Sequence, residues 1–320
     1  MIIVTGAAGF IGSCIVSGLN ENGITDILAV DVLGSDDKWK NLRNLNFYDY
    51  LDRDKLFEYL NSASGIEAII HMGACSATTE TDTNFLMENN YRYTLRLAEY
   101  CIEKNIQFIY ASSAATYGDG SQGSDDDESR LRLLKPMNMY GYSKHLFDLK
   151  AQREGWLDTI TGLKFYNVYG PNEYHKGDMT SVVYKAFNQI RENGYVKLFK
   201  SHQPDFKDGE QKRDFIYVMD AVNIVLYFLK NKNLTGIYNV GSGKSRMFKD
   251  LVSATFNAMG KEVNIKYIDM PHEIRDRYQY FTEAKMDKLI QSGYNEKMYS
   301  LENGITDYVQ NYLMKDFANY

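Results

Sequence analysis

The stretch MIIVTGAAGFIG, residues 1–12, decides the fold of this chain. Its first five residues are apolar and mostly β-branched, which predicts a buried strand. Beyond the glycines, large aliphatic residues recur every four positions, which predicts a helix with one apolar face: Ile11, Ile15 and Leu19. A glycine-rich turn that follows a strand and opens a helix is the setting of a phosphate-binding loop.

The three glycines of this turn suit the binding of a dinucleotide. Gly6 permits a tight turn, Gly9 lets the backbone approach a pyrophosphate, and Gly12 lets the helix pack on the strand. The helix N-terminus would offer unpaired N–H groups and a partial positive charge to the phosphates. The spacing is G-x-x-G-x-x-G, not G-x-G-x-x-G, and a glycine turn without a ligand is the alternative.

Short apolar runs and helical patterns alternate beyond this turn. Further strands are expected at residues 27–31, 68–71, 107–111 and 161–168, and short ones that rejoin the sheet edge at 215–217 and 237–240. Long helices are expected at 83–104 and from about Tyr140. The alternation predicts an α/β fold with a doubly wound parallel sheet of the Rossmann type, helices on both faces, and a smaller α/β substrate-binding lobe.

The predicted domains are discontinuous in sequence. Residues 1–170 with 214–240 are expected to form the cofactor-binding Rossmann domain, and 171–213 with 241–320 the substrate-binding domain. The acidic stretch 118–128 is expected to be a solvated loop. The run GSGKS at 241–245 ends like a Walker A loop. Tyr238 stands where that motif needs glycine, so we interpret the run as a turn at a helix start.

Composition excludes several classes of function. The 320 residues are 44% hydrophobic and 24% charged, as in an ordinary globular protein, and a net charge of −6 without a long basic run argues against a nucleic-acid partner. Cys14, Cys75 and Cys101 are too scattered for a disulfide framework, and the five histidines lack zinc-ligand spacing, so no metal is expected. Without a signal peptide or a membrane-length apolar stretch, we expect a cytoplasmic protein with no membrane partner.

Charged residues follow the second strand. Asp31 closes that strand about 20 residues after Gly12, where a carboxylate accepts a hydrogen bond from an adenosine ribose hydroxyl. A turn residue at a strand end is the alternative. Lys38 and Arg53 could pair with a 2′-phosphate, although surface lysines and arginines are usually only solvated.

A tyrosine and a lysine carry the second strong signal. Tyr140 and Lys144, in YGYSK, lie four residues apart and share one helical face. An ammonium close to a phenol favours the phenolate and lowers a pKa that starts near ~10. A phenolate can take the proton from a sugar hydroxyl while hydride leaves the same carbon. Ser113 follows the strand at 107–111, at the carboxyl end of the sheet where ligands bind in such folds.

On these motifs the chain resembles an extended short-chain dehydrogenase/reductase over essentially its whole length. Within that family it is similar to the nucleotide-sugar epimerases that act on ADP-heptose in lipopolysaccharide inner-core synthesis. The segments that carry the similarity are GACSATTE at 73–80, the run 110–118, NMYGYSK at 138–144, FYNVYGP at 165–171, HKG at 175–177, KRDF at 212–215 and RYQ at 277–279.

The resemblance implies tightly bound NADP, with NAD as the other option, and a homo-oligomer, specifically a homopentamer. It implies catalytic roles for Ser113, Tyr140, Lys144 and Lys176, the last as a second base. The cofactor would contact Gly6, Gly9, Phe10, Ile11, Gly12, Asp31, Val32, Lys38, Arg53, Met72, Gly73, Ala74, Cys75, Ser76, Asn89, Lys144, Val168 and Lys176. The substrate would contact Asn167, Asp178, Lys185, Phe199, Arg213 and Tyr278.

The chain departs from the family pattern on the substrate side. Asp178 and Lys185 stand where Ser and His are expected, and Lys-Ser-His at 200–202 replaces Glu-Gly-Ser. An unusually polar stretch, 201–212, follows. These departures concern recognition of the sugar or the adenine, and they leave the redox residues intact.

Three other functions compete with an ADP-heptose epimerase. A UDP-hexose 4-epimerase would share the fold and the Tyr–Lys pair. A dehydratase needs an extra acid and base, yet alanines stand at 114–115 where dehydratases carry carboxylates. A non-catalytic dinucleotide-binding protein would have no need of Ser113, Tyr140 and Lys144 together.

Overall fold

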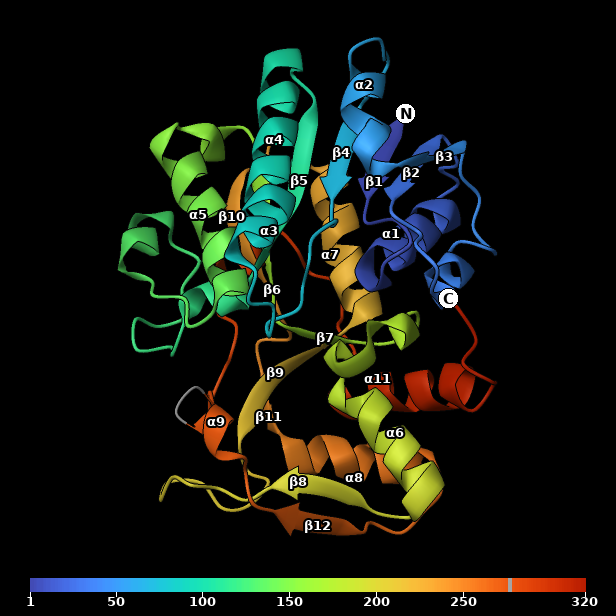
Figure 1. Cartoon of the computed structure of the whole chain (residues 1–320), viewed down its shortest axis with the longest axis vertical. Helices are drawn as coiled ribbons and strands as arrows, with labels where there is room; N and C mark the ends of the chain where they lie inside the picture. Colours follow the sequence, from blue (N-terminus) through green and yellow to red (C-terminus); the bar gives the residue numbers. More distant parts are fainter. Residues whose placement is uncertain (276–277) are drawn as a thin grey trace.

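The computed structural model describes residues 1–275 and 278–320, which form a larger and a smaller lobe (Figure 1). The larger lobe is built on a parallel sheet of seven strands in the order β10-β6-β5-β4-β1-β2-β3. Its strands are β1 (Ile2–Thr5), β2 (Ile27–Asp31), β3 (Asp49–Asp52), β4 (Ala68–His71), β5 (Gln107–Ser113), β6 (Thr161–Phe165) and β10 (Gly236–Val240). The order reverses between β1 and β4, and at such a point a doubly wound sheet opens a crevice for a ligand.

Helices cover both faces of this sheet, which is the predicted Rossmann arrangement. Its main helices are α1 (Phe10–Glu21), α2 (Leu56–Leu60), α3 (Thr83–Leu86), α4 (Tyr93–Lys104), α5 (Met139–Arg153) and α7 (Val218–Lys230). The helix predicted at 83–104 is present, with a π-helical segment, η3 (Met87–Arg92), between α3 and α4. α1 packs on α7, while α3 and η3 pack on α5. The fold prediction is therefore confirmed for this lobe.

The smaller lobe is built from segments that follow β6 (Figure 1). Its helices are α6 (Val182–Asn193), α8 (Phe248–Ala258), α9 (His272–Arg275) and α11 (Leu301–Asp307), which continues as η8 (Tyr308–Leu313), whereas α10 (Asp287–Gln291) packs on β10 of the larger lobe. The strands of the smaller lobe are β7 (Asn167–Tyr169), β8 (Val196–Phe199), β9 (Lys212–Tyr217), β11 (Ser245–Met247) and β12 (Ile265–Ile268). α8 packs against both α6 and α11, and its buried face includes Leu251, Val252 and Phe256.

Two strand predictions need correction and one is confirmed. The strand expected at 161–168 ends at Phe165, and β7 then leaves the main sheet. The strand expected at 215–217 is the end of β9, which pairs with β7 and β11 in a separate three-stranded sheet. The prediction for 237–240 is confirmed because β10 pairs with β6 at the edge of the main sheet. Apolar runs indicate strands, but their pairing depends on partners distant in sequence.

The acidic stretch 118–128 is not simply a solvated loop. Asp126 is buried, and its carboxylate accepts a hydrogen bond from the N–H of Asn239 at 2.9 Å. Glu128 accepts from the N–H of Ile237 at 2.8 Å and pairs with Lys288. These N–H groups belong to β10, an edge strand whose outer groups have no neighbouring strand, so the two carboxylates cap that edge.

The GSGKS run is a loop between two strands and not a helix start. The N–H groups of Ser242 and Gly243 donate to the buried carboxylate of Asp214, at 2.7 and 3.0 Å. β11 begins at Ser245, the last residue of the run, and α8 begins only at Phe248. In the described parts of the chain, no helix combines the length and apolar character that crossing a membrane requires.

Candidate active site

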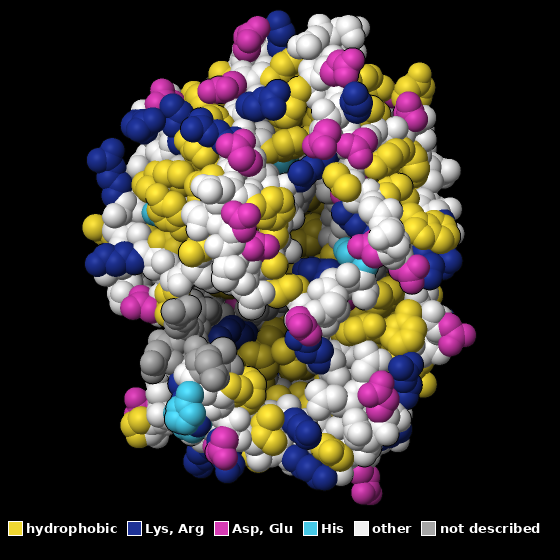
Figure 2. Space-filling view, viewed as in Figure 1, with side chains coloured by type: hydrophobic (Ala, Val, Ile, Leu, Met, Phe, Trp, Pro, Cys, Tyr) yellow, Lys and Arg dark blue, Asp and Glu magenta, His cyan; other side chains and the backbone are white. Residues whose placement is uncertain are grey.

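A hollow opens between the two lobes at the carboxyl ends of the parallel strands (Figure 2). One cavity of about 570 Å³ runs along the glycine turn, and a second of about 340 Å³ continues toward the smaller lobe. A third, of about 200 Å³, lies beside Asp31 and Arg53. Together the first and third are lined by every predicted cofactor residue except Val168, which lines the second.

The glycine turn has the geometry that its sequence predicts. Gly6 has φ +67°, and a side chain there would lie 2.7 Å from the backbone of Gly73. A Cβ on Gly12 would lie 2.0 Å from the carbonyl oxygen of Gly6, so α1 approaches the turn too closely for any side chain. Gly9 caps α1 without a side-chain hydrogen bond, and no acidic residue follows in the first turn. This helix end therefore suits an anion.

Asp31 ties the glycine turn to the second strand. Its Oδ2 accepts from the N–H of Ala8 at 2.8 Å, and its Oδ1 accepts from the N–H of Val32 at 2.7 Å. The ammonium of Lys38 lies 2.5 Å from the same Oδ1. The pairing offsets the negative charge of Asp31, so this carboxylate repels an added phosphate less than it would alone.

Arg53 reaches the same end of the groove. Its guanidinium donates to the side-chain oxygen of Asn89. Its Nε is buried and makes no hydrogen bond to a described residue, although the carboxylate of Asp54 lies 3.4 Å away. A buried guanidinium N–H without an acceptor fits a phosphate at this position.

Ser113, Tyr140 and Lys144 meet where β5 ends and α5 begins. Asn138 caps α5 by accepting from the N–H of Gly141 at 2.7 Å, which fixes the first turn that carries Tyr140. The side chain of Ser113 lies near the Tyr140 hydroxyl, and both residues line the 340 Å³ cavity. The ammonium of Lys144 donates to the carbonyl of Ala111 at 2.9 Å.

The electrostatics of the pair differ from the expectation. Burial raises the pKa of the Tyr140 phenol, and the nearby Ser113 side chain opposes that rise. Burial also lowers the pKa of Lys144 to about 8, while Asp148 opposes the fall. Because the Lys144 ammonium is directed at a backbone carbonyl, the predicted lowering of the Tyr140 pKa by Lys144 is not found in the protein alone.

Lys176 brings a second amine to the hollow from a different element. It lies in η7 (Tyr174–Met179), and its Nζ is 5.4 Å from the ring centroid of Phe10 at the start of α1. Burial lowers the pKa of Lys176, and the buried carboxylate of Glu173 opposes this. Lys176 and Tyr140 line both the 570 Å³ and the 340 Å³ cavities.

The predicted substrate residues fall into two groups. Asn167 and Asp178 line the 340 Å³ cavity, whereas the exposed ammonium of Lys185 donates to the backbone carbonyl of Asp178 at 2.6 Å. The other three form an aromatic cluster with a buried guanidinium: Phe199, Arg213 and Tyr278.

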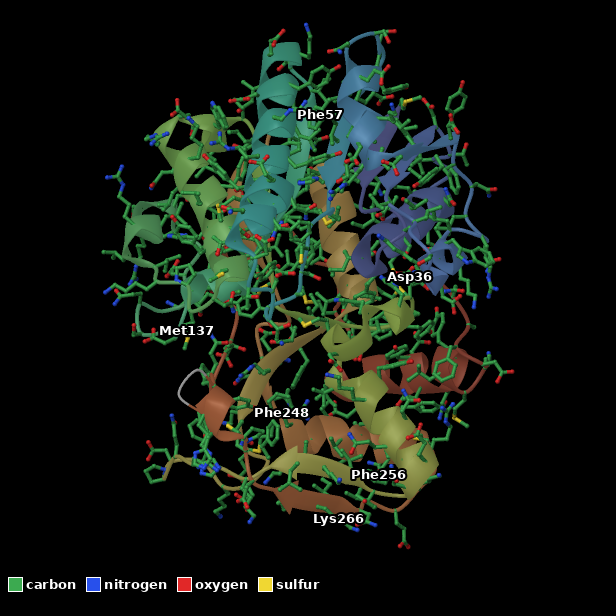
Figure 3. The ribbon with its side chains drawn as sticks, in the orientation of Figure 1. Asp36, Phe57, Met137, Phe248, Phe256 and Lys266 are labelled. Atoms are coloured by element: carbon green, nitrogen blue, oxygen red, sulfur yellow. The ribbon has the colours of Figure 1, made fainter. Side chains whose placement is uncertain are left out.

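Phe248 connects this aromatic cluster to the cavity. Its ring lies 5.7 Å from the guanidinium of Arg213, and it lines the 340 Å³ cavity. It stands at the start of α8, on the side of the smaller lobe that faces the larger lobe (Figure 3). Arg277, in the RYQ motif, lies outside the described residues.

The structure adds residues that sequence reasoning missed. Phe165, His175 and Met179 also line the 570 Å³ cavity. Behind it, Asp148 and Lys164 form a completely buried ion pair. A signal for this pair was available, because Lys164 interrupts an otherwise uncharged strand, TGLKF, and Asp148 lies four residues after Lys144.

Comparison with known proteins places the chain among sugar-nucleotide enzymes. Residues 2–241 match the model of the NAD dependent epimerase/dehydratase family. Proteins named ADP-L-glycero-D-manno-heptose-6-epimerase from Nitratidesulfovibrio vulgaris (strain DP4) and Fusobacterium nucleatum subsp. nucleatum are each 55% identical to it. The alignments cover 98% and 99%, respectively, of both this chain and the relative.

Solved structures agree with this placement. The Helicobacter pylori protein named ADP-L-glycero-D-manno-heptose-6-epimerase is 28% identical, with a TM-score of 0.82 over 97% of this chain and 95% of that one. A UDP-glucose 4-epimerase from Thermotoga maritima is 25% identical, with a TM-score of 0.77 over 99% of both chains. By sequence and by structure, this chain belongs to the NAD dependent epimerase/dehydratase family.

Proposed function

We propose that this enzyme interconverts ADP-D-glycero-D-manno-heptose and ADP-L-glycero-D-manno-heptose by transient oxidation at C6, in lipopolysaccharide inner-core synthesis. The observation that carries the proposal is that Tyr140 and Lys176, from different elements, line the same hollow as Ser113. The relatives at 55% identity over almost their whole length carry that activity in their names. We further propose a homopentamer, as the sequence resemblance implies, and a cytoplasmic location.

The cofactor of this reaction is a nicotinamide dinucleotide, and we propose NADP. The glycine turn and the uncapped N-terminus of α1 suit its pyrophosphate. Lys38 and the buried Nε of Arg53 suit a 2′-phosphate, and Lys38 also offsets the charge of Asp31. When bound, the oxidised nicotinamide accepts and returns the hydride and adds a positive charge that favours the phenolate of Tyr140.

Tyr140 is the proposed base for one C6 epimer. Ser113 lines the same cavity near the Tyr140 hydroxyl and suits a hydrogen bond to the reacting oxygen. Burial keeps the phenol protonated in the protein alone, so a nearby positive charge is needed before it acts as a base. Lys144 would add to that charge in the complex with the cofactor, whereas in the protein alone its ammonium is directed at the carbonyl of Ala111.

Lys176 is the proposed base for the other epimer. Inversion requires hydride to leave one face of C6 and return to the other, while the cofactor stays in place. The transient C6 ketone must turn about the adjoining carbon–carbon bond, so its oxygen points to two different places. One fixed phenol does not reach both, and a buried amine with a lowered pKa on another element suits the second place. A lysine that only binds the cofactor is the alternative.

The substrate would occupy the 340 Å³ cavity. Asn167 and Asp178 would contact the sugar there. Lys185 would act indirectly, because its ammonium donates a hydrogen bond to the backbone carbonyl of Asp178. The aromatic faces of Phe199 and Tyr278, with the buried guanidinium of Arg213, suit an adenine and a diphosphate. We propose that residues 1–170 with 214–240 hold the cofactor, and that 171–213 with 241–320 hold the substrate.

Product stereochemistry tests the proposal. The enzyme is incubated separately with ADP-D-glycero-D-manno-heptose and with a UDP-hexose, and the products are identified by NMR. Inversion at C6 of the heptose without net accumulation of NADPH supports the proposal. Inversion at C4 of the UDP-hexose, with an unchanged heptose, would replace it with a UDP-hexose 4-epimerase.

A further inference from the structure

A buried charge cluster lies directly behind the catalytic face of α5. The side chains of Asp148 and Lys164 are both 0% exposed, and their charged groups are 3.3 Å apart. Neither residue lines the cavities between the lobes. A buried ion pair is weak evidence for stability because desolvation offsets its attraction, so its place beside the site calls for another explanation.

Asp148 and the catalytic Lys144 both lie on α5, and both form hydrogen bonds to the same strand, β5. Asp148 lies one helical turn after Lys144, and thus on the same face. Its Oδ1 accepts from the hydroxyl of Tyr110 at 2.9 Å, and its Oδ2 accepts from the hydroxyl of Ser112 at 2.7 Å. Lys144 donates to the carbonyl of Ala111, the residue between them. Three consecutive residues of β5 therefore hold the lysine and the carboxylate in a fixed relation.

Lys164 supports the turn that carries the catalytic serine. It lies on β6, in register with Ser112 on β5. Its ammonium donates to the hydroxyl of Thr116 at 2.6 Å and lies 4.5 Å from the ring centroid of Tyr117. The hydroxyl of Thr116 in turn donates to the carbonyl of Ser113 at 2.8 Å. The ammonium thus reaches the backbone of Ser113 through one hydroxyl.

From this geometry, and resting on the proposed function, we infer that Asp148 and Lys164 are positioning residues of the reaction. Asp148 is the counterion that keeps Lys144 charged and in place beside Tyr140. Lys164 balances Asp148, so that the cluster holds two cations and one anion, and it fixes the turn that presents Ser113. Neither residue touches the substrate or the cofactor.

The charges around the cluster give the expected direction of each effect. Burial lowers the pKa of Lys144 to about 8, and Asp148 is the largest influence that raises it. The lysine is charged below this pKa and loses its proton as the pH rises through it. Other titratable groups face the cluster and are unchanged in the variants below: His71, Cys75, Tyr110, Tyr117, Asp126, Glu128 and His145.

The charge of Lys144 can be measured in the enzyme as purified with its cofactor. The ¹³Cε signal of Lys144 in lysine-labelled protein, assigned by its loss in Lys144→Met, is followed against pH. Asp148→Asn should lower its midpoint by at least about one pH unit, because the nearby anion is removed. Lys164→Met should raise it, because a nearby cation is removed. The double variant should return it toward the wild-type value.

Turnover gives the second readout. The alkaline limb of kcat should follow the Lys144 midpoint, so that Asp148→Asn loses about fivefold or more at pH 8 and less at pH 6.5, with KM for the sugar nucleotide unchanged. Asp220→Asn is the matched control, since Asp220 is also a buried carboxylate, on α7, and accepts from the N–H of Tyr299. Asp220→Asn should leave the alkaline limb of kcat at the same pH as in the wild type.

Opposite shifts in the two single variants are the decisive result, because a purely structural loss would not change sign. Midpoints that stay fixed, or that move in the same direction, overturn the inference. Midpoints that move as expected without any change in the alkaline limb also overturn it, because the cluster then has no role in turnover. If Asp148→Asn does not fold, Lys164→Met and the double variant still show in which direction the Lys144 midpoint moves. Wild-type epimerisation is measured in the same series, so failure of the proposed function is seen separately.

Discussion

The two sides of the interlobe hollow are built in different ways. On the cofactor side, one continuous segment makes most of the site: β1, the glycine turn and the start of α1, tied to Asp31 on the next strand. On the substrate side, the cavity collects single side chains from distant segments, such as Asn167 and Phe248. A site made by backbone geometry is local in sequence, whereas a site made by side chains depends on tertiary packing. The proposed catalytic residues Ser113, Tyr140 and Lys176 lie between the two.

The largest expected effect falls on the residue shared by both sides. Tyr140→Phe removes the proposed proton carrier and should lower kcat by roughly 10²–10⁴ while cofactor binding survives. Turnover and cofactor content are measured together. Tyr142→Phe is the matched control, because Tyr142 is exposed on the same helix, and it should retain activity. A fully active Tyr140→Phe enzyme would remove Tyr140 from the mechanism.

The cofactor side should be sensitive to a single methyl group. Gly12→Ala places a Cβ 2.0 Å from the carbonyl of Gly6, so the turn must shift. Overpacking of this kind costs about 1–3 kcal/mol or more. Thermal unfolding with and without added NADP should show lower stability and weaker stabilisation by the cofactor. Gly9→Ala, whose Cβ would lie 3.1 Å from the same oxygen, should have the smaller effect. Equal effects would contradict this ranking.

The adenosine end of the groove should set the choice between NADP and NAD. Lys38→Ala combined with Arg53→Ala should reduce the preference for NADP about ten- to hundredfold, the worth of one or two charge-assisted hydrogen bonds. Both affinities are measured by titration in each protein. Lys40→Ala is the control, because Lys40 is on the same turn but pairs with Asp37 on the surface. Tighter binding of NAD by the wild type, or an unchanged ratio in the double variant, would refute the assignment.

The smallest expected effect lies outside the site, at the capped sheet edge. Asp126→Ala leaves the N–H of Asn239 without its acceptor and should cost about 1 kcal/mol or more in the free energy of unfolding. Asp125→Ala removes a surface pair with Lys285 and should cost less.

The charge of Asp126 is not what stabilises this edge. Burial raises the pKa of Asp126 above its unfolded value, so its ionisation disfavours the folded state, and protonation as the pH falls through that pKa relieves this cost. Asp126→Asn should therefore be milder than Asp126→Ala in denaturant unfolding. An alanine variant as stable as the wild type would show that the hydrogen bond contributes nothing.

The contrast between the two sides also explains what the sequence predicted. The glycine turn, six of the seven strands of the main sheet and the meeting of Ser113 with Tyr140 and Lys144 followed from local patterns and chain order, whereas β3 was not predicted. The placement of β9, the capping role of Asp126 and the ion pair of Lys164 could not follow in this way. Each depends on a partner far away in the chain, and hydrophobic periodicity carries no information about pairing. The substrate residues came from resemblance alone, and their roles stay a prediction.

The central claim is that two proton carriers, Tyr140 and Lys176, serve the two epimers with one cofactor. Lys176→Met tests it most directly, in a single-turnover reaction with heptose deuterated at C6. The account predicts that deuterium still passes between one epimer and the cofactor through Tyr140, while the two epimers no longer interconvert. Ordinary epimerisation by Lys176→Met, with only the affinity for the cofactor changed, would contradict the account and leave Lys176 as a binding residue.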